Sequence, residues 1–250
     1  MSGHSKWSTI KRKKGAQDAK RGQIFTRLAR EIALAAREGG GDPETNFRLR
    51  LAVDRARAEN MPKDNIERAI KRGTGEDKSG GDLEEIIYEG YASHGVALMI
   101  SVVTDNRNRT VAELRHALGR YGGSMGEGGS VAWQFNRMAY FSFPAEGKDP
   151  DKIFELAVEA GADDVKFEEE TIEILGPVEA FKTIADALRT AHIDPEDAGL
   201  KYIPSNEMEL AVDATLQVLR CIEALEELDD VQEVFSNLSV SDEALARLEA

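Results

Sequence analysis

The residues most able to do chemistry in this chain are its cations, and they are concentrated at the N-terminal end. Within the first 37 residues, 10 Lys and Arg stand against two acidic residues, Asp18 and Glu31. Closely spaced cations neutralise phosphate, and an aromatic ring among them can stack on an exposed base. We therefore predict a nucleic-acid-binding arm and helix face, made of Lys6, Trp7, Lys11, Arg12, Lys13, Lys14, Lys20, Arg21, Arg27, Arg30 and Arg37.

The same residues have a second interpretation, a solvated basic terminus in which Trp7 anchors the domain. Phosphate binding is favoured because the cations continue onto the polar face of the helix expected over residues 20–37. No helix-turn-helix signature with a recognition helix is visible in the sequence. The pattern therefore indicates phosphate affinity and does not indicate base-specific reading of DNA.

A second candidate contact is the segment TDNRNRT, between a predicted strand and a predicted helix. Arg107 and Arg109 beside exposed helix-start amides could hold a phosphate, and Asn106 or Asn108 could reach a base edge or a peptide group. The alternative is a capped helix in which Asn108 or Thr110 accepts amide hydrogen bonds. Both interpretations are open at this stage.

Residues 122–130 contain five glycines, among them Gly128 and Gly129. A backbone without side chains can approach another surface closely, as a contact with RNA would require. The segment lacks the Gly-Lys-Ser/Thr ending of a nucleotide-binding P-loop. The alternative is a flexible connection between a helix and a strand.

Catalytic and metal sites find little support in the sequence. The carboxylates of Asp163–Asp164 and Glu168–Glu170 are typical of solvated faces, and nothing pairs them with a nucleophile or a base. The four histidines are scattered, and the single cysteine, Cys221, excludes an intramolecular disulfide and is predicted to pack in a core. We predict a non-enzymatic protein with no cofactor and no metal.

The formal net charge of −14 is unevenly distributed. Residues 1–78 carry 19 Lys and Arg against 11 Asp and Glu, a net +8, and residues 79–250 carry 13 against 35, a net −22. Residues 138–203 alone have 6 basic and 16 acidic residues, a net −10, and lack an RNA-recognition strand motif. The basic part should attract phosphate, and the acidic parts should contact protein or act as a spacer.

Hydrophobic periodicity predicts the elements that position these residues. Helices are expected over residues 20–37, 45–59 and 62–72, with Gly73 as a cap and a glycine-rich linker to residue 82. Strands 83–92 and 96–104, a helix 110–121 and a strand 131–135 follow. Next comes a β-α-β-β-α-β unit with strands 138–143, 164–169, 171–175 and 199–203 and helices 150–160 and 178–190. A helix 210–228 and a strand 231–235 complete the pattern, and residues 239–250 add a short helix or fray.

We therefore predict an α+β fold, with an N-terminal helical domain followed by two α/β ferredoxin-like domains, one inserted in the other. The predicted domains are residues 1–78, residues 82–137 plus 204–238, and the insertion 138–203. No stretch approaches the roughly 18 apolar residues of a membrane span, and lysines interrupt the first apolar positions. A cytoplasmic protein without membrane contact is expected.

Four motifs in order resemble the YebC family of bacterial proteins and its mitochondrial relatives: GHSKWSTIKRKKGAQDAKRGQIFTRLAREI, GGGDPETNFRLRLAVDRARAENMPKDNIERAIKRGTGE, TDNRNRT and YGGSMGEGGSVAWQF. The resemblance covers nearly the whole chain. It implies three domains and a role as a probable DNA-binding transcriptional regulator. Other members are similar to ribosome-associated translation factors, including a mitochondrial activator of cytochrome oxidase subunit synthesis and bacterial factors that assist proline-rich nascent chains.

Sequence and resemblance together predict a regulator of gene expression whose partner is DNA or RNA, with the ribosome as one form of the latter. The family description favours DNA. The −22 carried by residues 79–250 favours structured RNA, because it limits wrapping around duplex DNA. A protein-interaction adaptor is the rival, in which the acidic domains bind a protein partner and the basic end docks on them within the same chain.

Overall fold

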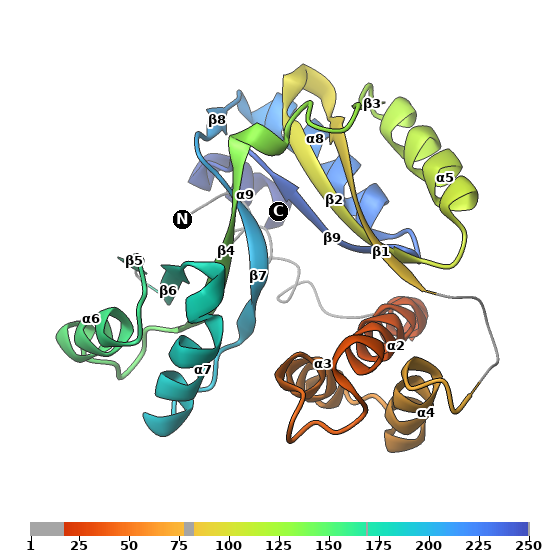
Figure 1. The fold of residues 1–250 in the computed structure, drawn as a ribbon. Coiled ribbons are helices and arrows are strands. Elements are labelled where there is room, and N and C mark those ends of the chain that lie inside the picture. The colour runs from red at the N-terminus through yellow and green to blue at the C-terminus, as the bar shows by residue number, and fades with distance from the viewer. Residues whose placement is uncertain (1–17, 78–82, 169, 250) are drawn as a thin grey trace.

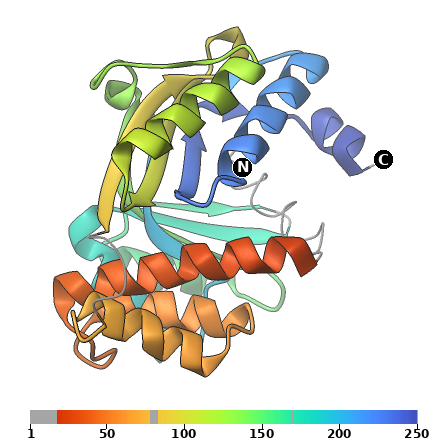
Figure 2. The same cartoon turned by 90° about the vertical axis from the view of Figure 1, so that its right-hand side faces the viewer.

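The computed structural model describes residues 18–77, 83–168 and 170–249. Its first unit contains the helices α2 (Asp18–Gly39), α3 (Phe47–Ala58) and α4 (Lys63–Gly73). In both ribbon views α2 lies between the other two helices and the first sheet (Figures 1 and 2). The apolar stripe of α2 packs on both neighbours through a core that includes Leu28, Ile32, Leu49, Val53 and Ile66. The predicted helices are confirmed, with ends shifted by a few residues.

The ends of α3 and α4 show why the shifts occur. Asn46 caps α3, because its Oδ1 accepts from the Leu49 amide at 3.1 Å. Its Nδ2 donates to the Ala35 carbonyl at 2.7 Å, which ties the start of α3 to the end of α2. The C-cap of α4 is Thr74, so the cap expected at Gly73 is wrong.

Gly73 serves close packing instead. A Cβ at this position would lie 2.2 Å from the carbonyl oxygen of Ala33 and 2.8 Å from the Cβ of Ala36. The last turn of α4 can therefore approach the backbone of α2 because residue 73 has no side chain.

The first sheet contains β1 (Glu84–Tyr91), β2 (Ala97–Thr104), β3 (Ser124–Met125) and β9 (Val231–Ser236) in the order β3-β1-β2-β9, with antiparallel pairing. Helices α5 (Arg107–Arg120) and α8 (Val212–Glu226) pack on one face. Cys221 is fully buried in this core, as predicted. On the other face, Phe235 packs edge-to-face on Tyr202 of the second sheet, with 5.5 Å between ring centroids.

The second sheet is built from residues between β3 and α8. It contains β4 (Phe135–Pro144), β5 (Asp164–Phe167), β6 (Thr171–Gly176) and β7 (Asp197–Pro204) in the order β5-β6-β4-β7. Helices α6 (Pro150–Glu159) and α7 (Phe181–Thr190) pack on it around Phe141 and Phe143. This is the strand order of a split β-α-β-β-α-β unit. The predicted α+β fold class is confirmed.

Three further elements complete the described chain. The short strands β8 (Met208–Glu209) and β10 (Leu238–Ser239) pair in parallel, and α9 (Asp242–Glu249) gives the C-terminal residues a helix. Helix α9 packs on α8 through Ala244, so a helix forms here where the sequence left open a helix or fraying. None of the described helices is long and apolar enough to cross a membrane.

Two further local predictions were wrong. Residues 131–135 were expected to form a strand, but Ala132–Gln134 form a 3-10 turn and β4 starts at Phe135. The amides of Val131 and Ala132 donate to the carboxylate of Glu89, which holds this segment out of a sheet ladder. Helix α5 starts at Arg107 rather than at residue 110, because Asn106 provides the cap by accepting from the Arg109 amide.

The α2–α4 contact gives a first prediction. We expect Gly73→Ala to lower the free energy of unfolding by about 1–3 kcal/mol, because its methyl group meets the backbone of α2. Gly22→Ala is the matched control, since a Cβ there meets no described atom within 4 Å and the residue is helical. That change should raise stability by up to about 1 kcal/mol. Urea unfolding of both variants measures the difference, and equal effects would show that the helices have room for a side chain at residue 73.

Candidate nucleic-acid interface

The arm expected to bind phosphate lies mostly outside the described residues. Lys6, Trp7, Lys11, Arg12, Lys13 and Lys14 precede the described chain. Lys20 and Arg21 belong to the first turns of α2, but their side chains also lie outside the described part. The arm precedes α2 in the sequence, and its affinity stays a prediction.

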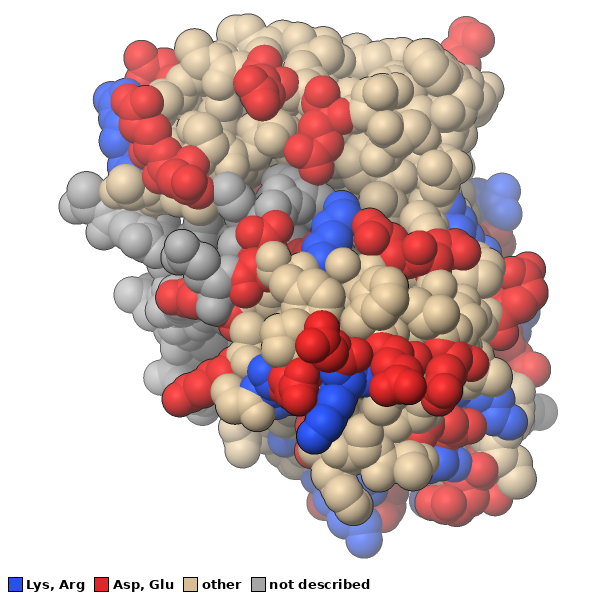
Figure 3. All heavy atoms as spheres, turned by 90° about the vertical axis from the view of Figure 1, so that its left-hand side faces the viewer, with Lys and Arg blue, Asp and Glu red and all other residues tan. Residues whose placement is uncertain are grey.

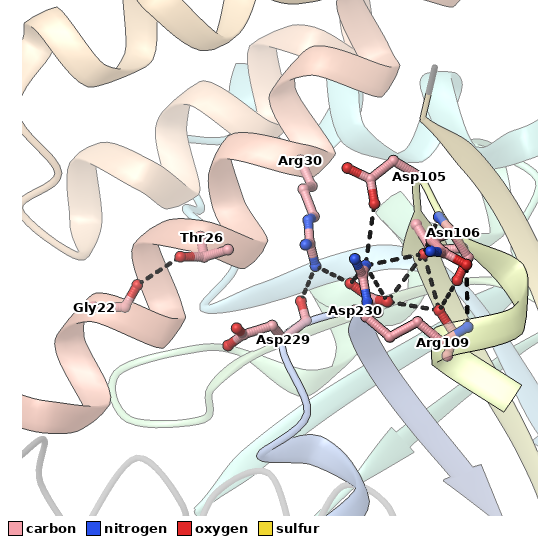
Figure 4. Close-up of polar contacts among 10 residues, drawn as sticks. Gly22, Thr26, Arg30, Asp105, Asn106, Arg109, Asp229 and Asp230 are labelled. Carbon is pink, nitrogen blue, oxygen red and sulfur yellow. Dashed lines mark hydrogen bonds and ion pairs between the residues drawn. The ribbon is translucent and has the colours of Figure 1, made fainter. Parts of the chain in front are cut away.

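The other three predicted cations, Arg27, Arg30 and Arg37, contact the first sheet unit from α2, although Arg37 stays exposed. Arg27 donates to the Glu226 carbonyl at 3.5 Å, and Arg37 donates to the Leu83 carbonyl at 2.7 Å. Arg30 donates to the Asp229 carbonyl and pairs with the Asp230 carboxylate at 2.7 Å (Figure 4). The polar face of α2 is thus occupied by contacts within the chain, as in the adaptor interpretation.

Asp230 is the centre of this contact. It lies in the turn between α8 and β9, and its side chain is 2% exposed. Arg30 reaches it from α2, and Arg109 reaches it from α5 at 2.8 Å (Figure 4). The hydroxyl groups of Thr104 and Thr110 donate to its Oδ2 at 2.9 and 2.6 Å. One carboxylate therefore joins the helical unit to a strand and a helix of the first sheet.

These partners lower the pKa of Asp230. Burial by itself raises the pKa of a carboxyl group, but the hydrogen bonds from Thr110, Arg109 and Thr104 and the charge of Arg30 outweigh it. Asp230 is therefore ionised at neutral pH, and its charge is available to hold both arginines.

A second charged junction joins all three parts of the structure. Arg55 of α3 pairs with Asp197 of β7 at 3.5 Å, and Lys201 of β7 pairs with Asp197 and, at 3.3 Å, with Glu233 of β9. Lys201 is 2% exposed and its Nζ lies 4.4 Å from the centroid of the Tyr140 ring. Burial opposes ionisation of Lys201, yet Glu233 and Asp197 raise its pKa. The lysine is therefore a buried cation.

The arginines of the TDNRNRT segment also form ion pairs within the chain. Arg107 pairs with Glu84 of β1, and Arg109 binds Asp105 as well as Asp230. The capping interpretation holds in part, because Asn106 rather than Asn108 or Thr110 accepts the amide. Arg107 keeps 64% of its side chain exposed, so it is the more accessible of the two arginines.

Glu89 organises the glycine-rich segment. Its carboxylate accepts from the amides of Gly129, Val131 and Ala132 at 2.6, 2.7 and 2.9 Å. Burial raises the pKa of Glu89, but these three hydrogen bonds outweigh it and the pKa is lowered. Side chains added at Gly128 or Gly129 would meet no described atom within 4 Å, although Gly129 has a φ of +87°. The segment thus presents an open backbone on an anchored turn.

Trp133, which follows this turn, was not among the predicted site residues. Its side chain is 75% exposed, and its Nε1 donates to the Ser130 carbonyl at 3.1 Å. Tyr91 donates to the same carbonyl at 3.0 Å. The signal available in the sequence was its place soon after the glycine-rich segment. An exposed indole that is held in one position is a stacking surface for a base.

The cations of α4 were also not among the predicted site residues. Arg68, Lys71 and Arg72 lie three or four residues apart, and none of them has an ion pair within the described chain. Arg68 and Arg72 line a groove of about 300 Å³ between α2 and α4, beside Phe25 and Met61. The spacing i, i+3, i+4 was the signal that could have identified this face. These cations are available to an anionic partner while α2 contacts the first sheet.

The acidic part of the molecule offers a different surface. In the face drawn in Figure 3, acidic side chains make up the larger part of the charged surface. The residues 138–203 that form most of the second sheet carry the net −10 noted above. No group of three His, Cys, Asp or Glu residues that could hold a metal ion is found among the described residues.

Comparisons with known proteins agree with this architecture. Residues 5–76 match the family model of the TACO1/YebC protein N-terminal domain, and residues 83–238 match that of the TACO1/YebC second and third domain. A probable transcriptional regulatory protein of Acidithiobacillus ferrooxidans is 54% identical over 250 residues, covering 100% of this chain and 99% of the relative. One of the same name from Thermotoga petrophila is 51% identical, with 100% of both chains covered.

A solved structure is similar as well. The crystal structure of a conserved hypothetical protein from Aquifex aeolicus has a TM-score of 0.82 and 41% sequence identity, and the match covers 90% of this chain and 93% of that one. The curated relatives are named as regulatory proteins and not as enzymes.

The network around Asp230 gives a second prediction. Asp230→Asn keeps the shape of the side chain and removes its charge, so we expect the free energy of unfolding at neutral pH to fall by about 2–3 kcal/mol. Because the folded-state pKa is lowered, this contribution is present above the unfolded pKa of about 3.9 and is lost as pH falls through the folded value. Urea unfolding across this pH range should show the two proteins converging in acid.

The control for this prediction is Asp229→Asn. Asp229 is exposed and contributes its carbonyl to Arg30, so the change should leave stability within about 0.5 kcal/mol. A constant gap between wild type and Asp230→Asn at all pH values would contradict the assignment of the effect to the carboxylate charge.

Proposed function

The chain belongs to the TACO1/YebC family, and we propose that it is a non-enzymatic, cytoplasmic regulator of gene expression that acts by binding nucleic acid. The observation that carries the proposal is the separation of charge, with +8 on residues 1–78 and −22 on residues 79–250. A basic module on an acidic body attracts a polyanion to one end of the molecule and repels it elsewhere. The names of the curated relatives support a regulatory role.

Two groups of cations are available for phosphate while the helical unit contacts the first sheet. The first is the arm at residues 6–21, which directly precedes and enters α2. The second is the α4 face formed by Arg68, Lys71 and Arg72, which have no ion pair within the described chain. The exposed Trp133 and the Gly128–Gly129 backbone supply a further contact on the first sheet unit, where a base could stack.

Duplex DNA is the target that the relatives' names favour, and a regulator of transcription is the first form of the proposal. The second form is a ribosome-associated factor that binds structured RNA and relieves stalling on proline-rich sequences. It is favoured by the acidic body, because 172 residues with −22 limit the surface that duplex DNA can follow, whereas a ribosome offers both phosphate and protein surfaces.

One sedimentation experiment separates the two forms. Cell extract is centrifuged through sucrose with and without prior RNase treatment, and the endogenous protein is followed in each fraction. Co-sedimentation with ribosomes that RNase abolishes supports the ribosomal form. A protein that stays at the top in both cases and shifts a DNA duplex in binding assays supports the transcriptional form.

The arm gives the third prediction. Replacing Lys11, Arg12, Lys13 and Lys14 with Ala should weaken binding to unrelated sequences alike, because phosphate contacts carry no sequence information. The slope of log affinity against log salt should fall by up to about 0.9 per lost phosphate contact on duplex DNA, and about 0.7 on a single strand. Fluorescence anisotropy with labelled oligonucleotides measures both quantities. An unchanged affinity and slope would remove the arm from the binding surface.

The α4 face gives the fourth prediction, with a control matched in charge and domain. Arg68→Ala with Arg72→Ala should weaken binding and reduce the salt slope by up to about 0.9 per contact on duplex DNA. Arg57→Ala with Lys63→Ala also removes two exposed cations, but these are paired with Asp54 and Glu67. The control pair should change binding less. Equal losses from both pairs would show that total charge, rather than the α4 face, determines affinity.

A further inference from the structure

The polar face of α2 is a continuous stripe of donors that faces the turn between α8 and β9. Gln23 donates to the Glu227 carbonyl at 3.2 Å, Arg27 to the Glu226 carbonyl at 3.5 Å, and Arg30 to the Asp229 carbonyl. Residues 23, 27 and 30 follow a spacing of four and three, which places them on one side of the helix. All three contacts end on residues 226–229 at the C-terminal end of α8.

This turn is strongly anionic for two reasons. The last carbonyls of a helix carry the negative end of its dipole and lack partners within the helix. Four of the five residues from 226 to 230 are acidic, and Asp230 is ionised in the folded protein. The α2 stripe therefore binds an array of anionic oxygens, which is also what the phosphates of a nucleic acid present to arginine.

We propose that the turn at residues 226–230 is an intramolecular competitor of nucleic acid for the α2 stripe, so that binding of a polyanion along α2 releases the helical unit from the turn. The inference rests on the proposed function, because it needs a nucleic acid that first engages the arm or α4. It adds that Arg27 and Arg30 bind phosphate in the released state only.

The other contacts between the helical unit and the rest of the molecule are compatible with its release from the turn. The apolar part made by α2 is a small cluster in which Ala33 and Leu34 pack on Leu83 and Val103. From α3, the Phe47 ring packs edge-to-face on Phe181 of α7, with 5.4 Å between ring centroids. The ionic contacts of α3 are Arg48 to Glu85 at 3.0 Å and Arg55 to Asp197 at 3.5 Å, and both arginines are more than one-third exposed. Interfaces of this polar kind between domains of one chain resemble transient protein contacts.

Hydrogen exchange on the full wild-type chain tests the proposal directly. Exchange is followed by mass spectrometry with and without a saturating single-stranded RNA and a DNA duplex. We expect faster exchange in residues 226–231 and at Val103, whose amide donates to the Asp230 carbonyl at 2.9 Å. Binding that leaves both segments protected would overturn the inference and leave the proposed function intact. No binding to either polymer would overturn the proposed function, and this inference with it.

A variant that opens the contact provides an independent test. Leu34→Glu places a charge in the apolar cluster and should raise affinity about tenfold, a typical size for coupling between sites. Ala58→Glu is the control, because it adds the same charge at an exposed position of α3. Adding Arg27→Ala and Arg30→Ala to Leu34→Glu should remove the gain. A gain that survives the loss of both arginines, or no gain in a Leu34→Glu protein shown by circular dichroism to be folded, would contradict the proposal.

Discussion

The arrangement of the helical unit on the first sheet depends on the need of one buried carboxylate for partners. Asp230 is 2% exposed, and a charge removed from water at this depth is tolerated only when it is paired and hydrogen-bonded. Its partners come from three elements, with Arg30 on α2, Thr104 on β2 and Arg109 on α5. Satisfying the charge therefore fixes the position of α2 relative to the strand and the helix. The same constraint pairs Arg30 and Arg109, which the sequence analysis assigned to phosphate, with a carboxylate of the same chain.

The junction around Lys201 follows the same physical rule with the signs reversed. A cation buried on β7 is held by Asp197 on the same strand and Glu233 on β9, and Arg55 of α3 completes the alternation of charge. Two ionic junctions thus orient three units whose apolar cores are largely separate. Removing one partner would leave a buried charge uncompensated, so such junctions specify one geometry more than they add net stability.

Local patterns predicted most of the fold, and long-range contacts explain the rest. The period of the apolar residues located α2 and α8, and the helix predicted over residues 150–160 matches α6, because these signals lie within one element. The segment at residues 131–135 was missed because Glu89, some forty residues away, binds its amides. The candidate site failed in the same way. Periodicity showed that Arg30 lies on a polar face, but its partner Asp230 is far along the chain.

The two kinds of cation in the basic part suit two different tasks. Arginine presents several donors in a planar fork, so one side chain can bind a carbonyl and a carboxylate together, as Arg30 does with Asp229 and Asp230. Lysine is a compact charge with little directional preference, which suits phosphates whose positions vary with sequence. The arginines at residues 27, 30, 37, 48 and 55 all cross to another unit, whereas lysines are concentrated at residues 6–14. Net charge alone therefore overstates the cations available to nucleic acid, and the subset free of intramolecular partners is the relevant quantity.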